Sequence, residues 1–111
     1  MSETAQSPVI TQCGVIFRKC NIIANHYGHP DQSRMLQEEA AELIQAVNKY
    51  WRNVADIEKA EAAEDNLVEE MADVIIMIIQ ECQLLHIDKE LFVDEIINKL
   101  DRQIKRIKEE V

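Results

Sequence analysis

The sequence is poor in the residues that interrupt helices. Only two glycines and two prolines occur among its 111 residues, and aromatic residues make up 5% of the chain. By contrast, 47% of the residues are hydrophobic and 30% are charged. This composition excludes collagen-like or long irregular structure and favours helices. We therefore expect an all-α protein, and the length is that of a single domain, residues 1–111, with residues 1–7 as a flexible tail.

The sequence also lacks paired cysteine motifs, long apolar runs and an excess of basic residues, and each absence excludes a class of protein. The cysteines Cys13, Cys20 and Cys82 lack CxxC spacing, so neither a disulfide framework nor a zinc knuckle is indicated. Such cysteines fit reduced thiols, so we expect a cytoplasmic protein. The longest apolar run, residues 74–79, is far below the roughly 18 residues of a membrane span, so we expect it to be soluble, without a membrane partner. Acidic residues outnumber basic ones by 21 to 12. The net charge of −9 argues against a nucleic-acid partner and suits cation binding.

Apolar residues at three- and four-residue intervals predict four helices. They cover about residues 8–26, 32–52, 66–85 and 88–111, with Asp31 or Ser33 capping the second and Asp88 capping the fourth. Residues 53–65 could form a short helix, an extension of the next helix or a mobile loop. The third helix is apolar almost all round, and so short a chain has too few helices to cover it. We therefore expect a four-helix bundle completed by oligomerisation, as a homodimer or homotetramer.

Four acidic residues stand out by their spacing. Glu39 and Glu42 lie one turn apart on the second predicted helix, so they form a two-carboxylate pincer. Glu70 and Asp73 form another on the third helix, where Asp73 interrupts an apolar run and needs a partner. If the pincers face each other, a cation would offset their repulsion, and all-oxygen ligands favour Mg²⁺, with Mn²⁺ as a substitute. Because Mg²⁺ often completes its shell with phosphate oxygens, the pattern points to phosphoryl or nucleotidyl chemistry.

Other interpretations of these acids stay open. Glutamates three residues apart are common on solvated helix faces, and a salt bridge from the fourth helix could neutralise Asp73. In that case the chain is a non-catalytic acidic helical interaction module. A di-iron carboxylate bundle is disfavoured, because that site uses Glu-x-x-His on two helices and the sequence has no such motif.

Together the acidic motifs resemble the MazG-like, all-α NTP pyrophosphatase superfamily, whose signature is EExxE, a spacer and ExxD. They read Glu38-Glu39-Ala40-Ala41-Glu42 and Glu70-Met71-Ala72-Asp73, and the likeness covers roughly residues 26–106. The resemblance implies a helical bundle assembled as a dimer or tetramer, with Mg²⁺ bound by Glu39, Glu42, Glu70 and Asp73. It implies a hydrolase that cleaves a nucleoside triphosphate to the monophosphate and pyrophosphate, in nucleotide-pool housecleaning. A related alternative is a phosphoribosyl-ATP pyrophosphohydrolase.

The remaining site residues are expected around these acids. Glu38 or Glu69 would orient or deprotonate the attacking water. A basic ridge on the fourth helix could meet the triphosphate or pair with neighbouring acids; it consists of Lys99, Arg102 and Arg106. Trp51 and His26 are candidates for contacting the base, because their rings can stack on it.

Overall fold

Helices make up almost all of the computed structural model, which describes residues 8–110; the predicted tail, residues 1–7, lies outside the described residues. In the described range the helices are α1 (Pro8–Tyr27), α2 (His29–Asn53), α3 (Ile57–Leu84) and α4 (Lys89–Glu109), and no strand forms. The all-α prediction is therefore confirmed. Of the alternatives for residues 53–65, the structure has an extension of the third helix. That helix is capped by Asp56, whose side chain accepts a 3.1 Å hydrogen bond from the Lys59 backbone N–H.

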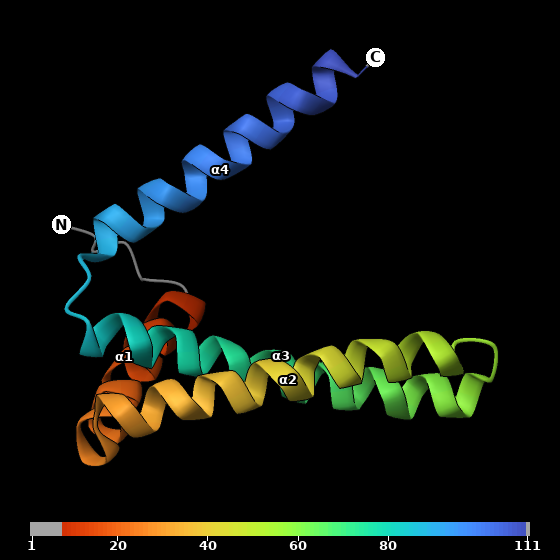
Figure 1. Cartoon of the computed structure of the whole chain (residues 1–111), viewed down its shortest axis with the longest axis horizontal. Helices are drawn as coiled ribbons and strands as arrows, with labels where there is room; N and C mark the ends of the chain where they lie inside the picture. Colours follow the sequence, from red (N-terminus) through yellow and green to blue (C-terminus); the bar gives the residue numbers. More distant parts are fainter. Residues whose placement is uncertain (1–7, 111) are drawn as a thin grey trace, which may run out of the picture.

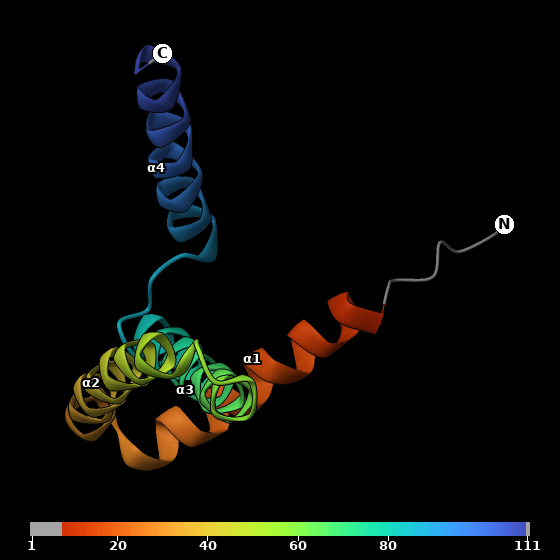
Figure 2. The same cartoon turned by 90° about the vertical axis from the view of Figure 1, so that its right-hand side faces the viewer.

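The helices form a three-helix body and one projecting arm. α2 and α3 run side by side as an antiparallel hairpin, and α1 crosses the end of this hairpin opposite to its tip (Figure 1). α4 extends away from the body in both views (Figures 1 and 2). The beginning of α4 lies near the body, where the Lys89 ammonium is 4.8 Å from the centre of the Phe17 ring. Among the described residues, no helix has the length and apolar character to cross a membrane.

A glycine precedes the start of α2, and an aspartate caps the start of α4. α2 starts at His29, after Gly28 with a φ of 87°, a left-handed conformation that glycine adopts without steric cost. The prediction that Asp31 or Ser33 caps this helix was wrong, because the helix begins earlier and no side chain caps it. Asp88 does cap α4, since its side chain accepts a 2.8 Å hydrogen bond from the Glu90 backbone N–H.

The buried core of a single chain is small. Among the described residues, the buried hydrophobic ones are Cys20, Ala24, Ala46, Ala63 and Met77. Most are small, so the helices can approach closely, but they bury little apolar area. Along α4, the large apolar side chains from Leu91 to Ile107 are 39 to 67% exposed. The radius of gyration is 17.9 Å, against about 13 Å for a compact chain of this length, so the single chain leaves much apolar surface uncovered.

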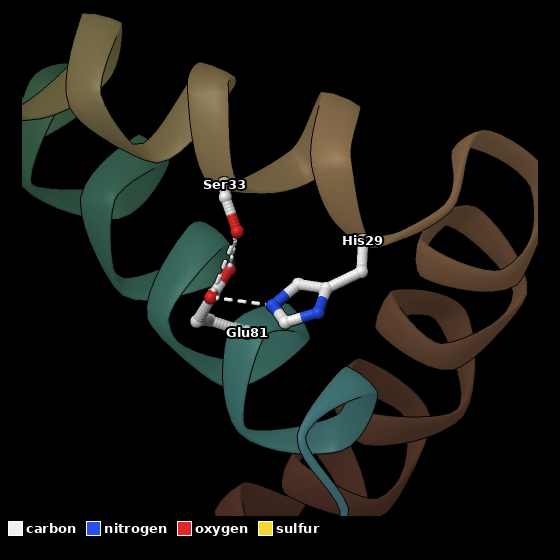
Figure 3. A network of polar contacts seen from close by, with 3 residues as sticks. All are labelled: His29, Ser33 and Glu81. Carbon is white, nitrogen blue, oxygen red and sulfur yellow. Dashed lines mark hydrogen bonds and ion pairs between the residues drawn. The ribbon is translucent and has the colours of Figure 1, made fainter.

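A polar cluster joins the beginning of α2 to the end of α3 (Figure 3). The ring nitrogen Nε2 of His29 donates a 2.7 Å hydrogen bond to the Glu81 carboxylate, and the Ser33 hydroxyl lies 2.9 Å from both of its oxygens. The hydrogen bond from His29, followed by that from Ser33, outweighs the opposing effect of burial and lowers the pKa of Glu81. The charged carboxylate therefore stabilises the packing of α2 on α3.

We expect Glu81→Gln to lower the free energy of unfolding at neutral pH by about 1 kcal/mol, because the part-exposed cluster loses charge-assisted hydrogen bonds. A lowered folded-state pKa stabilises the fold above the ordinary value of 4.5, and this contribution is lost as the pH falls through the lowered value. The difference between wild type and variant should therefore shrink in acid.

Thermal unfolding followed by circular dichroism over about pH 3 to 7 measures this difference. Glu64→Gln, on the exposed surface of α3, is the matched control for loss of one charge. If Glu81→Gln and Glu64→Gln gave the same melting curves at neutral pH, the stabilising role of the cluster would be refuted.

Candidate functional site

The α2–α3 hairpin brings the two acidic motifs together. Carboxylate oxygens of Glu39, Glu70 and Asp73 all lie within 4.8 Å of one another. The antiparallel arrangement explains this, because residues spaced three and four apart on each helix form stripes that face each other along the hairpin. Glu39 and Glu70 are half-buried, whereas Asp73 is exposed. The predicted pincers therefore do face each other, as a cation site requires.

Glu42 completes a cluster of four carboxylates. Burial, followed by the nearby charges of Glu42 and Asp73, raises the pKa of both Glu39 and Glu70 above the ordinary value of 4.5. Glu42 also makes a side-chain contact with each of these two carboxyls that raises their pKa. The ionised forms of Glu39 and Glu70 are thus disfavoured by burial and by the neighbouring negative charges.

The buried oxygens of this cluster fit a divalent cation. Glu39 Oε2 and Glu70 Oε2 are buried and have no hydrogen-bond partner among the described residues. A buried carboxylate oxygen without a donor is costly, and a cation would satisfy it. All the available ligand atoms are carboxylate oxygens, which suit Mg²⁺ or Mn²⁺ better than zinc or copper.

The alternative of a salt bridge to Asp73 is not realised within the chain. The fourth helix, from which the cation was expected, projects away from the carboxylates, and Asp73 has no ion pair in residues 8–110. On that helix, Lys99 lies 3.7 Å from the Glu95 carboxylate, and both side chains are exposed. Lys99, Arg102 and Arg106 are therefore not brought to the carboxylate cluster of their own chain.

Glu38 and Glu69, the predicted water-activating residues, are both exposed and each directly precedes a carboxylate of the cluster. The charge of Glu69 contributes to raising the pKa of Glu70, after burial and the charges of Glu42 and Asp73. Glu38 lines a cavity on the α1 side of the cluster. The two residues therefore flank the carboxylates from different helices.

That cavity, of about 610 Å³, lies between α1, α2 and α3, and we call it the apolar cavity. Its lining consists of Ile23, Tyr27, Asp31, Gln32, Arg34, Met35, Glu38, Ile76, Met77 and Gln80. Gln32 and Gln80 are only 4% and 1% exposed, and the Oε1 atom of each has no hydrogen-bond partner in the described residues. An apolar cavity with a few unsatisfied polar groups is typical of small-molecule sites.

A second cavity, of about 590 Å³, adjoins the cluster on the side of the hairpin tip, and we call it the polar groove. Its lining consists of Glu42, Gln45, Ala46, Asn48, Lys49, Arg52, Asn66 and Glu70. The two cations and three amides of its lining thus lie beside carboxylates of the cluster. The cluster therefore stands between an apolar cavity and a polar groove.

The two predicted base-contacting residues lie far apart along α1 and α2. Trp51 is 70% exposed near the hairpin tip, next to Arg52 of the polar groove. His26 is exposed at the end of α1, and its ring packs edge-on against that of Tyr27, 4.7 Å between ring centres. Of the pair, only His26 therefore has a direct neighbour in the lining of the apolar cavity.

Sequence reasoning did not single out Gln80 or Lys49, although a signal for both was present. Gln80 follows Asp73 by seven residues and Lys49 follows Glu42 by seven, so each lies two turns further along the same helix face. A search for polar residues on the same helix faces as the carboxylates would therefore have identified Gln80 in the apolar cavity and Lys49 in the polar groove.

A comparison with family models gives one finding. The model of the MazG nucleotide pyrophosphohydrolase domain matches residues 28–108. Neither the curated proteins nor the solved structures contain a match to the chain. The matched segment includes all of α2 and α3, and with them the four carboxylates. The match covers well over half of the chain, and the chain therefore belongs to the MazG nucleotide pyrophosphohydrolase domain family.

Proposed function

We propose that the protein is a cytoplasmic, Mg²⁺-dependent hydrolase that cleaves (d)NTPs to (d)NMPs and pyrophosphate in nucleotide-pool housecleaning. The observation that carries the proposal is the carboxylate cluster, with two buried oxygens that lack a partner, in a domain of this family. In the proposed site Glu39, Glu42, Glu70 and Asp73 hold Mg²⁺, and Mn²⁺ can replace it.

The proposed reaction is attack of water on the α-phosphorus. Glu38 or Glu69 accepts a proton from the attacking water, whose oxygen bonds to the α-phosphorus while the bond to the bridging oxygen breaks. Pyrophosphate leaves with that oxygen. Bound Mg²⁺ would supply positive charge to the phosphate oxygens and lower the pKa of a coordinated water.

The apolar cavity is the proposed place for the nucleoside. Tyr27 offers an aromatic ring, with His26 packed against it, and the buried Gln32 and Gln80 offer unpaired amide oxygens to hydrogen-bond donors on a base. Trp51, next to Arg52 near the hairpin tip, would contact the base only if the nucleoside lay toward that tip instead.

An assembly of two or four chains is part of the proposal. The exposed apolar side chains of α4 and of α3, among them Ile75, would be covered by a second copy. In such an assembly the basic ridge Lys99, Arg102 and Arg106 would meet the substrate of a neighbouring subunit, because α4 points away from its own carboxylates.

A screen of canonical and modified (d)NTPs with Mg²⁺ tests the proposed activity. We expect pyrophosphate release by the wild type, and a loss of at least about a hundredfold in kcat/KM for Glu42→Gln and Asp73→Asn, because each removes a charged ligand of the cation. Hydrolysis in ¹⁸O-labelled water should place the label in the monophosphate.

The exposed Glu61→Gln on α3 is the control and should keep full activity. Equal turnover by the wild type, Glu42→Gln and Asp73→Asn would refute the site. Cleavage of phosphoribosyl-ATP in preference to every (d)NTP would favour the related enzyme. If no nucleotide is cleaved and Mg²⁺ leaves the melting temperature unchanged, the protein is a non-catalytic interaction module.

Removal of the metal gives a separate test. The folded state raises the pKa of Glu39 and Glu70. The contribution of these two groups to stability is therefore complete below pH 4.5, and it is lost as the pH rises through their raised pKa values. The metal-free protein is therefore destabilised at neutral pH. We expect Glu70→Gln to raise its melting temperature in EDTA by a few degrees and to remove most of the stabilisation by excess Mg²⁺.

Thermal unfolding in EDTA and in excess Mg²⁺ gives both quantities, with Glu61→Gln again as the control. A Glu70→Gln protein that melts below the wild type in EDTA would contradict the expected relief of repulsion.

Multi-angle light scattering tests the assembly. We expect the mass of two or four chains for the wild type and a lower mass for Ile97→Glu, because a charge on the apolar face of α4 opposes its burial. Asn98→Glu adds the same charge on the opposite side of the helix and should keep the wild-type mass. A wild-type mass of one chain would exclude the proposed assembly.

A further inference from the structure

The polar groove contains two cations with no assigned role. Lys49 and Arg52 of α2 line it, and neither forms an ion pair in the described part of the chain. Both side chains are exposed, so each can bind an anion without a change in the fold. Asn66 of α3 lies across the groove from them, half-buried. The groove thus offers hydrogen-bond donors from both helices of the hairpin.

These donors lie on the same faces of α2 and α3 as the four carboxylates. Lys49 follows Glu42 by two turns on α2, and Asn66 precedes Glu70 by one turn on α3. Glu42 and Glu70 themselves line the same groove. Lys49 and Asn66 also line a smaller adjoining cavity of about 280 Å³, which includes Lys59. The lining of these two cavities therefore changes from acidic at the cluster to basic toward the tip.

The cavity on the other side of the cluster lacks this character. Its single cation, Arg34, is accompanied by the acids Asp31 and Glu38, and much of the remaining lining is apolar. A polyphosphate is strongly hydrated and anionic, so it favours cations and amide donors over apolar walls. The two sides of the cluster thus differ in the part of a nucleotide that they suit.

We propose that the polar groove binds the pyrophosphate end of the substrate, with Lys49 and Arg52 contacting the β- and γ-phosphates. This inference rests on the proposed function, and it sets the direction in which the nucleotide lies: nucleoside toward α1, distal phosphates toward the hairpin tip. The planar guanidinium of Arg52 can bond two phosphate oxygens at once, whereas the Lys49 ammonium acts as a point charge. The amide of Asn66 is a further donor.

Product binding tests the direction directly. Calorimetry with inorganic pyrophosphate and Mg²⁺ measures the affinity of the full chain for one product, and titration with the nucleoside monophosphate measures the other. We expect Lys49→Gln and Arg52→Gln each to weaken pyrophosphate binding about tenfold, since each loses a charge-assisted hydrogen bond. The affinity for the monophosphate should stay within about twofold.

Lys19→Gln and Arg18→Gln remove the same charges from the exposed surface of α1, outside both cavities, and should bind both products as the wild type does. Circular dichroism checks that each variant is folded. Equal pyrophosphate affinity of Lys49→Gln, Arg52→Gln and wild type would overturn the subsite, as would a loss confined to the monophosphate.

The outcome separates this inference from the proposed function. A wild type that releases pyrophosphate, with variants that bind it unchanged, refutes the groove alone. A wild type that neither hydrolyses a nucleoside triphosphate nor binds pyrophosphate refutes both.

Discussion

Repulsion among four carboxylates is the constraint on which the rest of this structure depends. Glu39 and Glu70 are held where their charged forms are disfavoured, so other interactions must keep α2 and α3 together. Part of that stabilisation comes from the end of the hairpin away from its tip, where Glu81 has a lowered pKa beside His29 and Ser33. One carboxylate of α3 thus contributes to holding the helices together, while others on the same helix oppose it.

The hairpin also arranges three kinds of chemistry in a line. Apolar walls adjoin α1, carboxylates occupy the middle, and cations lie toward the tip. A nucleoside triphosphate has the same three parts in order: a largely apolar ring, the phosphate that reacts, and a strongly anionic tail. This correspondence supports the proposed function, in which a hairpin of two helices, with one helix across its end, binds a whole nucleotide.

Much of the fold, and the centre of the site, could be predicted from the sequence, because both follow from local periodicity. The spacing of Glu39, Glu42, Glu70 and Asp73 predicted that they lie on facing helix sides. Glu39, Glu70 and Asp73 do lie together, and Glu42 is close enough to raise the pKa of Glu39 and Glu70. The start of α2 could not be predicted in this way, since it depends on the positive φ of Gly28. The direction of α4 depends on a short turn, so periodicity could not show that its basic ridge points away from its own carboxylates.

The geometry of the site also depends on the small side chains of Ala46 and Ala63. Both are buried along the hairpin, and neither has a reactive group. The separation of two packed helices depends on the size of the side chains between them, commonly 8–10 Å between axes. Larger residues at these positions would wedge the helices apart and move the carboxylates on α2 away from those on α3. Tolerance to mutation in this hairpin is therefore governed by side-chain volume as much as by charge, even at residues without a polar side chain.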